Sequence, residues 1–171
     1  ISLVSSMVPI ATFIYYPLKK IFVYAFKNFG AFSVEINSNI STKLLIKPYK
    51  SLKLLGSGGS KGIPENYRQS ILNNLKTNTK RLFIGSAGIE TIMLAKNEIQ
   101  FIFHGRVTPW DHSPMDLITK EAGGFVYMAI NKDEFNITSK GSILAASDIK
   151  TWYKTRDLII PKDNPYKRYK N

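Results

Sequence analysis

Residues 106–126, RVTPWDHSPMDLITKEAGGFV, place an acidic residue directly before a segment with the features of a short helix. Ser113 is a favourable N-cap residue, and Pro114 suits the first helical position. Apolar side chains then recur at helical spacing, and a pair of glycines is typical of a helix end. The sequence therefore predicts a helix over 115–122, with Asp111 in the loop just upstream.

The position of Asp111 needs a reason of its own. A carboxylate is favoured near the partial positive charge at a helix N-terminus. Ser113 and Asp116 already fill that role, in an arrangement close to a capping box. We therefore expect Asp111 to face outward, toward a partner such as a hard cation that takes oxygen ligands.

Upstream of this segment, residues 80–104 alternate between strand and helix patterns. A short strand, a turn of small residues, a helix over about 87–96 and a strand over 99–104 follow one another. The turn, Gly-Ser-Ala at 85–87, exposes backbone N–H groups at a helix start, which suits the oxygens of a polyol or a phosphate. A tight turn that only permits close helix packing is the other interpretation, and it is the stronger one from this segment alone.

A glycine-rich stretch, GSGGSKG at 56–62, invites comparison with phosphate-binding loops. It differs from a P-loop because Lys61 is followed by glycine rather than by serine or threonine, and it lacks the third glycine of a dinucleotide fingerprint. We expect a flexible connection between a strand and the helix that opens at Pro64 and Glu65. Lys61 remains able to contact an anionic substrate.

The N-terminal region carries no charge over its first eighteen residues, as a membrane span or signal segment would. Pro9 and several hydroxyl residues interrupt the apolar run, and no initial methionine with a basic region is present. Residues 10–32 fit a β-hairpin instead, and the polar stretch 37–44 is predicted to be a loop. We expect no membrane segment, and a chain that begins inside a strand is expected to be a fragment.

Composition limits the class of protein. A length of 171 residues with 44% hydrophobic content predicts a single domain over 1–171. There is no cysteine, which excludes disulfides and thiolate metal sites and makes a cytoplasmic location the expectation. The net charge of +12 comes from nineteen lysines against five arginines spread along the chain, so it indicates a general bias and no nucleic-acid partner.

These residues together carry a family resemblance. Trp110-Asp111, followed by the run Glu121-Ala-Gly-Gly and preceded by Gly-Ser-Ala at 85–87, resembles the C-terminal half of the inositol monophosphatase family. The end of the hairpin, Gly30-Ala-Phe, and the closing ILAAS at 143–147 support it. The resemblance implies an α/β fold, a layered sandwich of the α+β kind, in which 1–171 is the C-terminal portion. Its members hydrolyse phosphomonoesters with Mg²⁺.

The resemblance also assigns roles to individual residues. Asp111 matches a catalytic aspartate that binds Mg²⁺, and Trp110 is expected to pack beneath the site. Substrate contacts are implied for Gly85, Ser86, Ala87 and His104. Some relatives place an acidic contact to the inositol ring where this chain has His104, so the substrate need not be inositol phosphate itself. For His112, hydrogen bonding within the protein is a better interpretation than metal ligation.

Part of the family pattern is missing. The D-P-x-D-G-T motif and an upstream glutamate, which supply most of the metal ligands, do not occur in 1–171. For this reason the 171-residue fragment alone is predicted to be inactive.

The resemblance as a whole implies a Mg²⁺-dependent hydrolase that acts on a small phosphorylated substrate, such as inositol monophosphate or a related polyol or sugar phosphate. Many members of the family are dimers, which leaves a homodimer open. The alternative is a non-catalytic anion-binding or interaction protein with half of a phosphatase fold.

Overall fold

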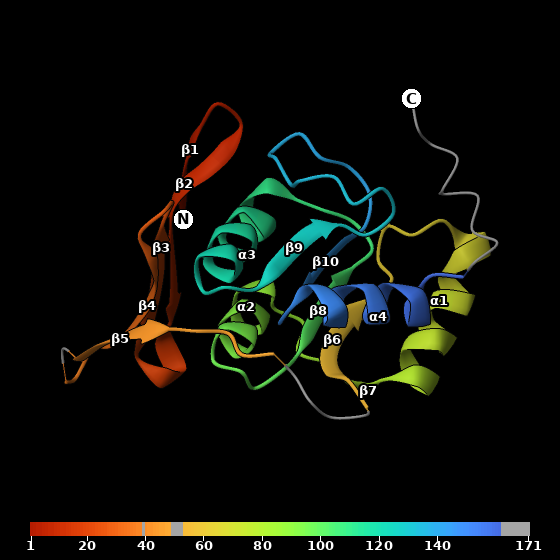
Figure 1. The fold of residues 1–171 in the computed structure, drawn as a ribbon, viewed down its shortest axis with the longest axis horizontal. Helices are drawn as coiled ribbons and strands as arrows, with labels where there is room; N and C mark the ends of the chain where they lie inside the picture. Colours follow the sequence, from red (N-terminus) through yellow and green to blue (C-terminus); the bar gives the residue numbers. More distant parts are fainter. Residues whose placement is uncertain (39, 49–52, 162–171) are drawn as a thin grey trace.

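The computed structural model describes residues 1–38, 40–48 and 53–161, and they form alternating layers of sheet and helix (Figure 1). An antiparallel sheet is followed by helices α2 and α3, then by a mixed sheet, and helices α1 and α4 cover the remaining face of that second sheet. The bounds of the helices are α1 Glu65–Asn78, α2 Ala87–Ala95, α3 Pro109–Glu121 and α4 Ile149–Ile159. The predicted layered α/β fold is confirmed.

The first sheet is a meander in the order β1-β2-β3-β4-β5. Its strands are β1 Ser2–Ser5, β2 Val8–Tyr16, β3 Ile21–Phe26, β4 Gly30–Glu35 and β5 Ile40–Leu44. The predicted hairpin over 10–32 is confirmed by the pairing of β2 with β3, but its second strand ends at Phe26 and the chain turns again into β4 at Gly30. The predicted loop over 37–44 is wrong, because 40–44 forms the edge strand. Four of its five residues are exposed, so it lacks the apolar alternation that would have identified it as a strand.

The second sheet has the order β7-β6-β8-β10-β9, with the parallel strands β7, β6 and β8 on one side. Its strands are β6 Leu55–Gly59, β7 Lys80–Leu82, β8 Phe101–His104, β9 Phe125–Met128 and β10 Ile143–Ala146. Parallel strands direct their carboxyl ends to one edge of the sheet, and ligands commonly bind there. Here that edge also meets the N-termini of α2 and α3.

Residues 56–59 of the glycine-rich stretch belong to strand β6, so the flexible connection predicted there is wrong for most of its length. A Cβ on Gly56 would lie 2.4 Å from the ring of Phe101, and a Cβ on Gly58 would lie 2.8 Å from Leu75. Glycines therefore leave room for large side chains on one face of this strand. Ser57, between them, points to the opposite face and is 3% exposed.

Helix α3 begins earlier than predicted. Thr108 precedes it and Pro109 is its first residue, so Ser113 and Pro114 lie inside the helix and do not cap it. The Thr-Pro pair offers the same start signal one and a half turns upstream. As a result Asp111 lies in the first helical turn, and its predicted position in an upstream loop is wrong. No helix among the described residues has the length and apolar character that spanning a membrane requires.

Two apolar cores hold the layers together. The first lies between the sheets and includes Val23 of β3, Leu94 of α2 and Met115 of α3, each fully buried. The second lies between the mixed sheet and the outer helices, where Trp152 of α4 is fully buried. The indole N–H of Trp152 donates to the carbonyl of Leu144 at 2.8 Å, so its one polar atom is satisfied.

Asp116, which we expected at a helix start, is instead buried in the middle of α3. Its carboxylate lies 2.9 Å from Lys120 Nζ, and that ammonium also lies 2.7 Å from Glu134. Burial raises the pKa of Asp116 to about 6, although the positive charge of Lys120 opposes the shift. The folded protein therefore holds this proton more tightly than the unfolded chain does.

A pH-dependent loss of stability follows from this raised pKa. The contribution of the Asp116 proton is present at pH 4 and is lost as the pH rises through about 6. We expect the free energy of unfolding to fall by about 2 kcal/mol between pH 4 and 7, relative to an Asp116→Asn variant. Denaturant unfolding of both proteins across this range measures the difference. Parallel pH profiles would contradict the assignment.

Candidate active site

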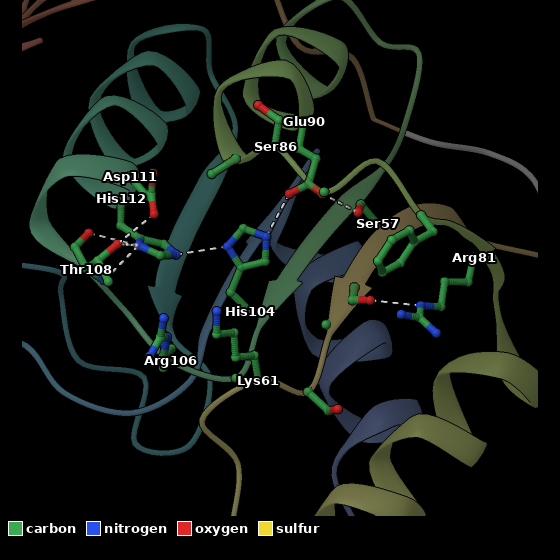
Figure 2. A pocket seen from close by; sticks show the side chains of 17 residues that line it. Ser57, Lys61, Arg81, Ser86, Glu90, His104, Arg106, Thr108, Asp111 and His112 are labelled. Carbon is green, nitrogen blue, oxygen red and sulfur yellow. Dashed lines mark hydrogen bonds and ion pairs between the residues drawn. The ribbon is translucent and has the colours of Figure 1, made fainter.

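A cleft of about 440 Å³ opens at the carboxyl ends of β7, β6 and β8 (Figure 2). The strands, the turns that follow them and the first turns of α2 and α3 all contribute to its walls. Its polar and charged lining residues are Ser57, Ser60, Lys61, Arg81, Ser86, Glu90, His104, Arg106, Thr108, Asp111 and His112. The two predicted substrate-contact elements, residues 85–87 and His104, are thus brought to the same cleft as Asp111.

The small-residue turn begins α2 at one side of the cleft. Ser86 is the N-cap residue, and its hydroxyl accepts a hydrogen bond from the N–H of Ile89 at 3.4 Å. Gly85 has a φ of +75° and no atom within 4 Å of an added Cβ, so the chain there is open to the cleft. Free N–H groups of a first helical turn favour an anion or a polar oxygen at this position.

Asp111 stands across the cleft in the first turn of α3. Its Oδ2 accepts a hydrogen bond from the Thr108 hydroxyl at 2.8 Å. Within the described ranges, no protein donor is recorded for its other carboxylate oxygen. One oxygen is therefore held in place, and the other is available to a ligand.

A chain of hydrogen bonds crosses the floor of the cleft from β6 to α3. The Ser57 hydroxyl donates to Glu90 Oε1 at 2.6 Å, and the other Glu90 oxygen lies 2.7 Å from His104 Nε2. His104 Nδ1 lies 2.9 Å from His112 Nε2, and His112 Nδ1 lies 2.9 Å from the Thr108 N–H. Figure 2 shows these contacts as one continuous series of dashed lines. Four elements of the fold are connected by it.

Side-chain alternation explains why the chain of contacts forms. On β8, Phe101 and Phe103 face the outer helices, so Ile102 and His104 face α2 and α3. Ser57 pairs with Ile102 in the parallel register and shares that face. Glu90 is the charged residue of an otherwise apolar first turn and is only 4% exposed, so it needs partners of this kind.

The contacts favour one arrangement of the ring protons. The Thr108 carbonyl lies 2.9 Å from His112 Nδ1 and accepts the helical N–H of His112, whereas, among the described residues, Nδ1 is the acceptor for the Thr108 N–H. We therefore assign the His112 proton to Nε2, which donates to His104 Nδ1, and the His104 proton to Nε2, which donates to Glu90. Burial, with the charge of His104 second, lowers the pKa of His112 to about 4, so its ring is neutral at pH 7.

Both histidines use their ring nitrogens within this network. His104 lines the cleft as expected, but its two ring nitrogens face Glu90 and His112, which leaves the ring edge to meet a ligand. His112 bonds within the protein, as interpreted from its sequence position. Ser57, Glu90 and Thr108 were not predicted from the sequence. A lone carboxylate in an apolar helix was the available signal for Glu90.

Trp110 does not occupy its expected place beneath the site. Its side chain is 74% exposed and borders a separate shallow pocket with Ile14, Tyr15 and Pro114. The early start of α3 is the reason, because it places Trp110 at the second helical position and turns it outward.

The donor atoms fit a hard cation only in part. Asp111 offers a free carboxylate oxygen, while Glu90 is occupied by Ser57 and His104. Among the described residues, no group of three or more histidine, aspartate or glutamate side chains is placed to hold a metal ion. His104 and His112 bond to each other and do not converge on a common centre with Asp111. The chemistry of the free oxygen suits Mg²⁺, which needs further oxygen ligands.

Comparisons with known proteins identify the family and the fold of the chain. A model described as the inositol monophosphatase family matches residues 1–164. Three similar solved structures are an inositol monophosphatase II from Staphylococcus aureus (TM-score 0.73, 18% identity, 88% of this chain and 55% of that one), an inositol monophosphatase from Zymomonas mobilis (0.78, 14%, 92% and 60%) and the extragenic suppressor protein suhB from Bartonella henselae (0.79, 19%, 94% and 61%).

Because these structures share only 14–19% of their residues with the chain, the likeness shows a common fold. The chain spans about three fifths of the length of the structures it matches. A search of curated proteins gave no significant match.

Proposed function

Because the chain belongs to the inositol monophosphatase family, we propose that it contributes the substrate-binding half of a Mg²⁺-dependent phosphomonoesterase. The observation that carries this proposal is the cleft in which Asp111, with one free carboxylate oxygen, faces the N-terminus of α2. The substrate is a polyol or sugar phosphate, such as inositol monophosphate. Two of the similar Staphylococcus structures contain inositol monophosphate and 2'AMP, which supports a small phosphorylated substrate.

Each element of the cleft has a distinct role in this proposal. Asp111 would hold Mg²⁺ through the oxygen that Thr108 leaves free. The metal supplies charge neutralisation at the phosphoryl group. Ser86 and the N–H groups of the first turn of α2 bind and orient the substrate oxygens. Gly85 and Ala87 keep that approach free of bulky side chains, and the His104 ring forms part of the wall.

Activity needs ligands beyond those that the described residues supply. Mg²⁺ prefers octahedral oxygen coordination and usually combines carboxylates with water and substrate phosphate. Asp111 alone cannot hold a catalytic cluster, so we expect residues 1–171, assayed by themselves, to release no phosphate. A cytoplasmic location and a homodimer remain expectations, from the lack of cysteine and from the family resemblance respectively.

Phosphate release from a panel of polyol and sugar monophosphates tests the proposal. The protein as the cell makes it is expected to hydrolyse at least one of them with Mg²⁺, and EDTA should abolish the reaction. Residues 1–171 are assayed by themselves beside it and are expected to release no phosphate. Absence of hydrolysis in both samples, together with binding of phosphate esters, would favour the alternative of a non-catalytic anion-binding protein.

A further inference from the structure

Lys61 and Arg106 place two positive charges on the same wall of the cleft. Lys61 follows β6 and Arg106 follows β8, so each comes from the turn at the carboxyl end of a parallel strand. In the view of Figure 2 both side chains rise below His104, on the side of the cleft away from Ser86. This wall is thus separate from the small-residue turn that begins α2.

The backbone fixes the two turns against each other. Gly62 has a φ of +87°, and an added Cβ there would lie 2.5 Å from Arg106 Cβ. A Cβ on Gly105 would lie 2.8 Å from the carbonyl oxygen of Lys61. The N–H of Gly105 donates to the carbonyl of Gly59 at 3.0 Å, which ties the ends of the two strands together. Close packing that only glycine permits therefore brings the backbones that carry the two cations close together.

The two carboxylates that line the cleft bond to partners other than these cations. Glu90 accepts from Ser57 and His104, and Asp111 accepts from Thr108. No ion pair of Lys61 or Arg106 is recorded among the described residues. Two like charges held together in a cleft raise the local potential, and an anion bound there would relieve their repulsion.

We propose that Lys61 and Arg106 bind a second anionic group of the substrate, on the wall opposite the small-residue turn. This inference rests on the proposed function, in which the phosphate to be hydrolysed lies between Asp111 and the N-terminus of α2. The preferred substrate is then a sugar or polyol that carries a phosphate at each end, or a phosphate and a carboxylate. A cleft of about 440 Å³ has room for a ligand of that size.

Three probes with one carbon skeleton and different charges separate the alternatives. Glucose 6-phosphate has one anionic group, glucose 1,6-bisphosphate has two phosphates, and 6-phosphogluconate has a phosphate and a carboxylate. Calorimetry at low salt in EDTA, so that no probe is hydrolysed, on the protein as the cell makes it, is expected to show about tenfold tighter binding of at least one two-anion probe. The preference should shrink as salt is added, since exposed charges are screened.

Substitutions of Lys61 and Arg106 test whether these residues cause the tighter binding of two-anion probes. Lys61→Gln and Arg106→Gln should each weaken binding of the preferred two-anion probe about tenfold and leave glucose 6-phosphate within about twofold. Arg106→Lys keeps the charge and should retain the preference, which separates charge from packing against Gly62. Lys76→Gln removes an exposed charge of α1 outside the cleft and should change neither affinity.

Equal affinity of the wild-type protein for all three probes would overturn the inference, and so would equal weakening of one-anion and two-anion probes by the Gln variants. The proposed function fails separately. If no phosphate is released but the two-anion preference is present, the binding wall stands without the enzyme activity.

Discussion

Asp111→Asn is expected to lower Mg²⁺-dependent phosphate release by about a thousandfold without unfolding the protein. The asparagine oxygen can still accept the hydrogen bond of the Thr108 hydroxyl, so the first turn of α3 keeps its geometry. The negative charge that attracts Mg²⁺ is lost. Asp111 is exposed, so the change leaves no buried group without a partner. The effect is therefore chemical and should appear in kcat/KM and in the Mg²⁺ concentration needed for half-maximal rate.

Asp157→Asn is the matched control. Asp157 lies on α4, outside the cleft, with a side chain that is 68% exposed. We expect this variant to keep full activity, and both variants to melt within a few degrees of the wild-type protein. An Asp111→Asn variant that retains a tenth or more of the activity would show that Asp111 is not a metal ligand of the reaction.

Glu90→Ala is expected to destabilise the protein by about 3 kcal/mol, whereas Glu90→Gln should cost about 1 kcal/mol. Alanine removes the acceptor of both the Ser57 hydroxyl and the His104 ring at a position that is 4% exposed. Glutamine keeps one oxygen for His104 and can donate its amide to the Ser57 oxygen. The difference between the variants measures the unsatisfied hydrogen bonds and not the volume of the side chain.

Denaturant unfolding with Glu98→Ala as a control measures these costs. Glu98 is exposed beyond the end of α2 and should contribute little. Because the network reaches Thr108, we also expect Glu90→Ala to loosen the first turn of α3. Hydrogen exchange of the Thr108 N–H, which donates to His112 Nδ1, and of the His112 N–H, which donates to the Thr108 carbonyl, reports this directly. Equal stability of Glu90→Ala and Glu98→Ala would mean that the network does not hold the site together.

Local signals predicted much of the fold. The hairpin over 10–32, the helix beginning at Ala87 and the helix after Pro64 follow from periodicity and from turn residues near one another in sequence. Strand β5 was missed, and strand β6 extends through glycines that were predicted to form a flexible connection. The first is an exposed polar edge, and the second is glycine-rich because Phe101 and Leu75 fill the space beside it.

The site was predicted only where the residues lie close in the sequence or in the family motif. Asp111 and residues 85–87 were found in this way, and the structure places them at one cleft. Glu90, His104 and His112 meet because α2 and α3 pack side by side on the face of the sheet from which the His104 side chain projects, and no local pattern encodes that contact. The choice of cap for α3 was likewise ambiguous, since both Thr108-Pro and Ser113-Pro are good helix starts.

A crystal of the protein as the cell makes it, grown with Mn²⁺ in place of Mg²⁺ and with a sugar monophosphate, tests the central claim most directly. The account predicts an anomalous difference peak in contact with the Asp111 carboxylate and with a phosphate oxygen, and a substrate seated against Ser86. A phosphate ester bound in the cleft with no metal at Asp111 would contradict the account, and the chain would then be an anion-binding protein that retains the phosphatase fold.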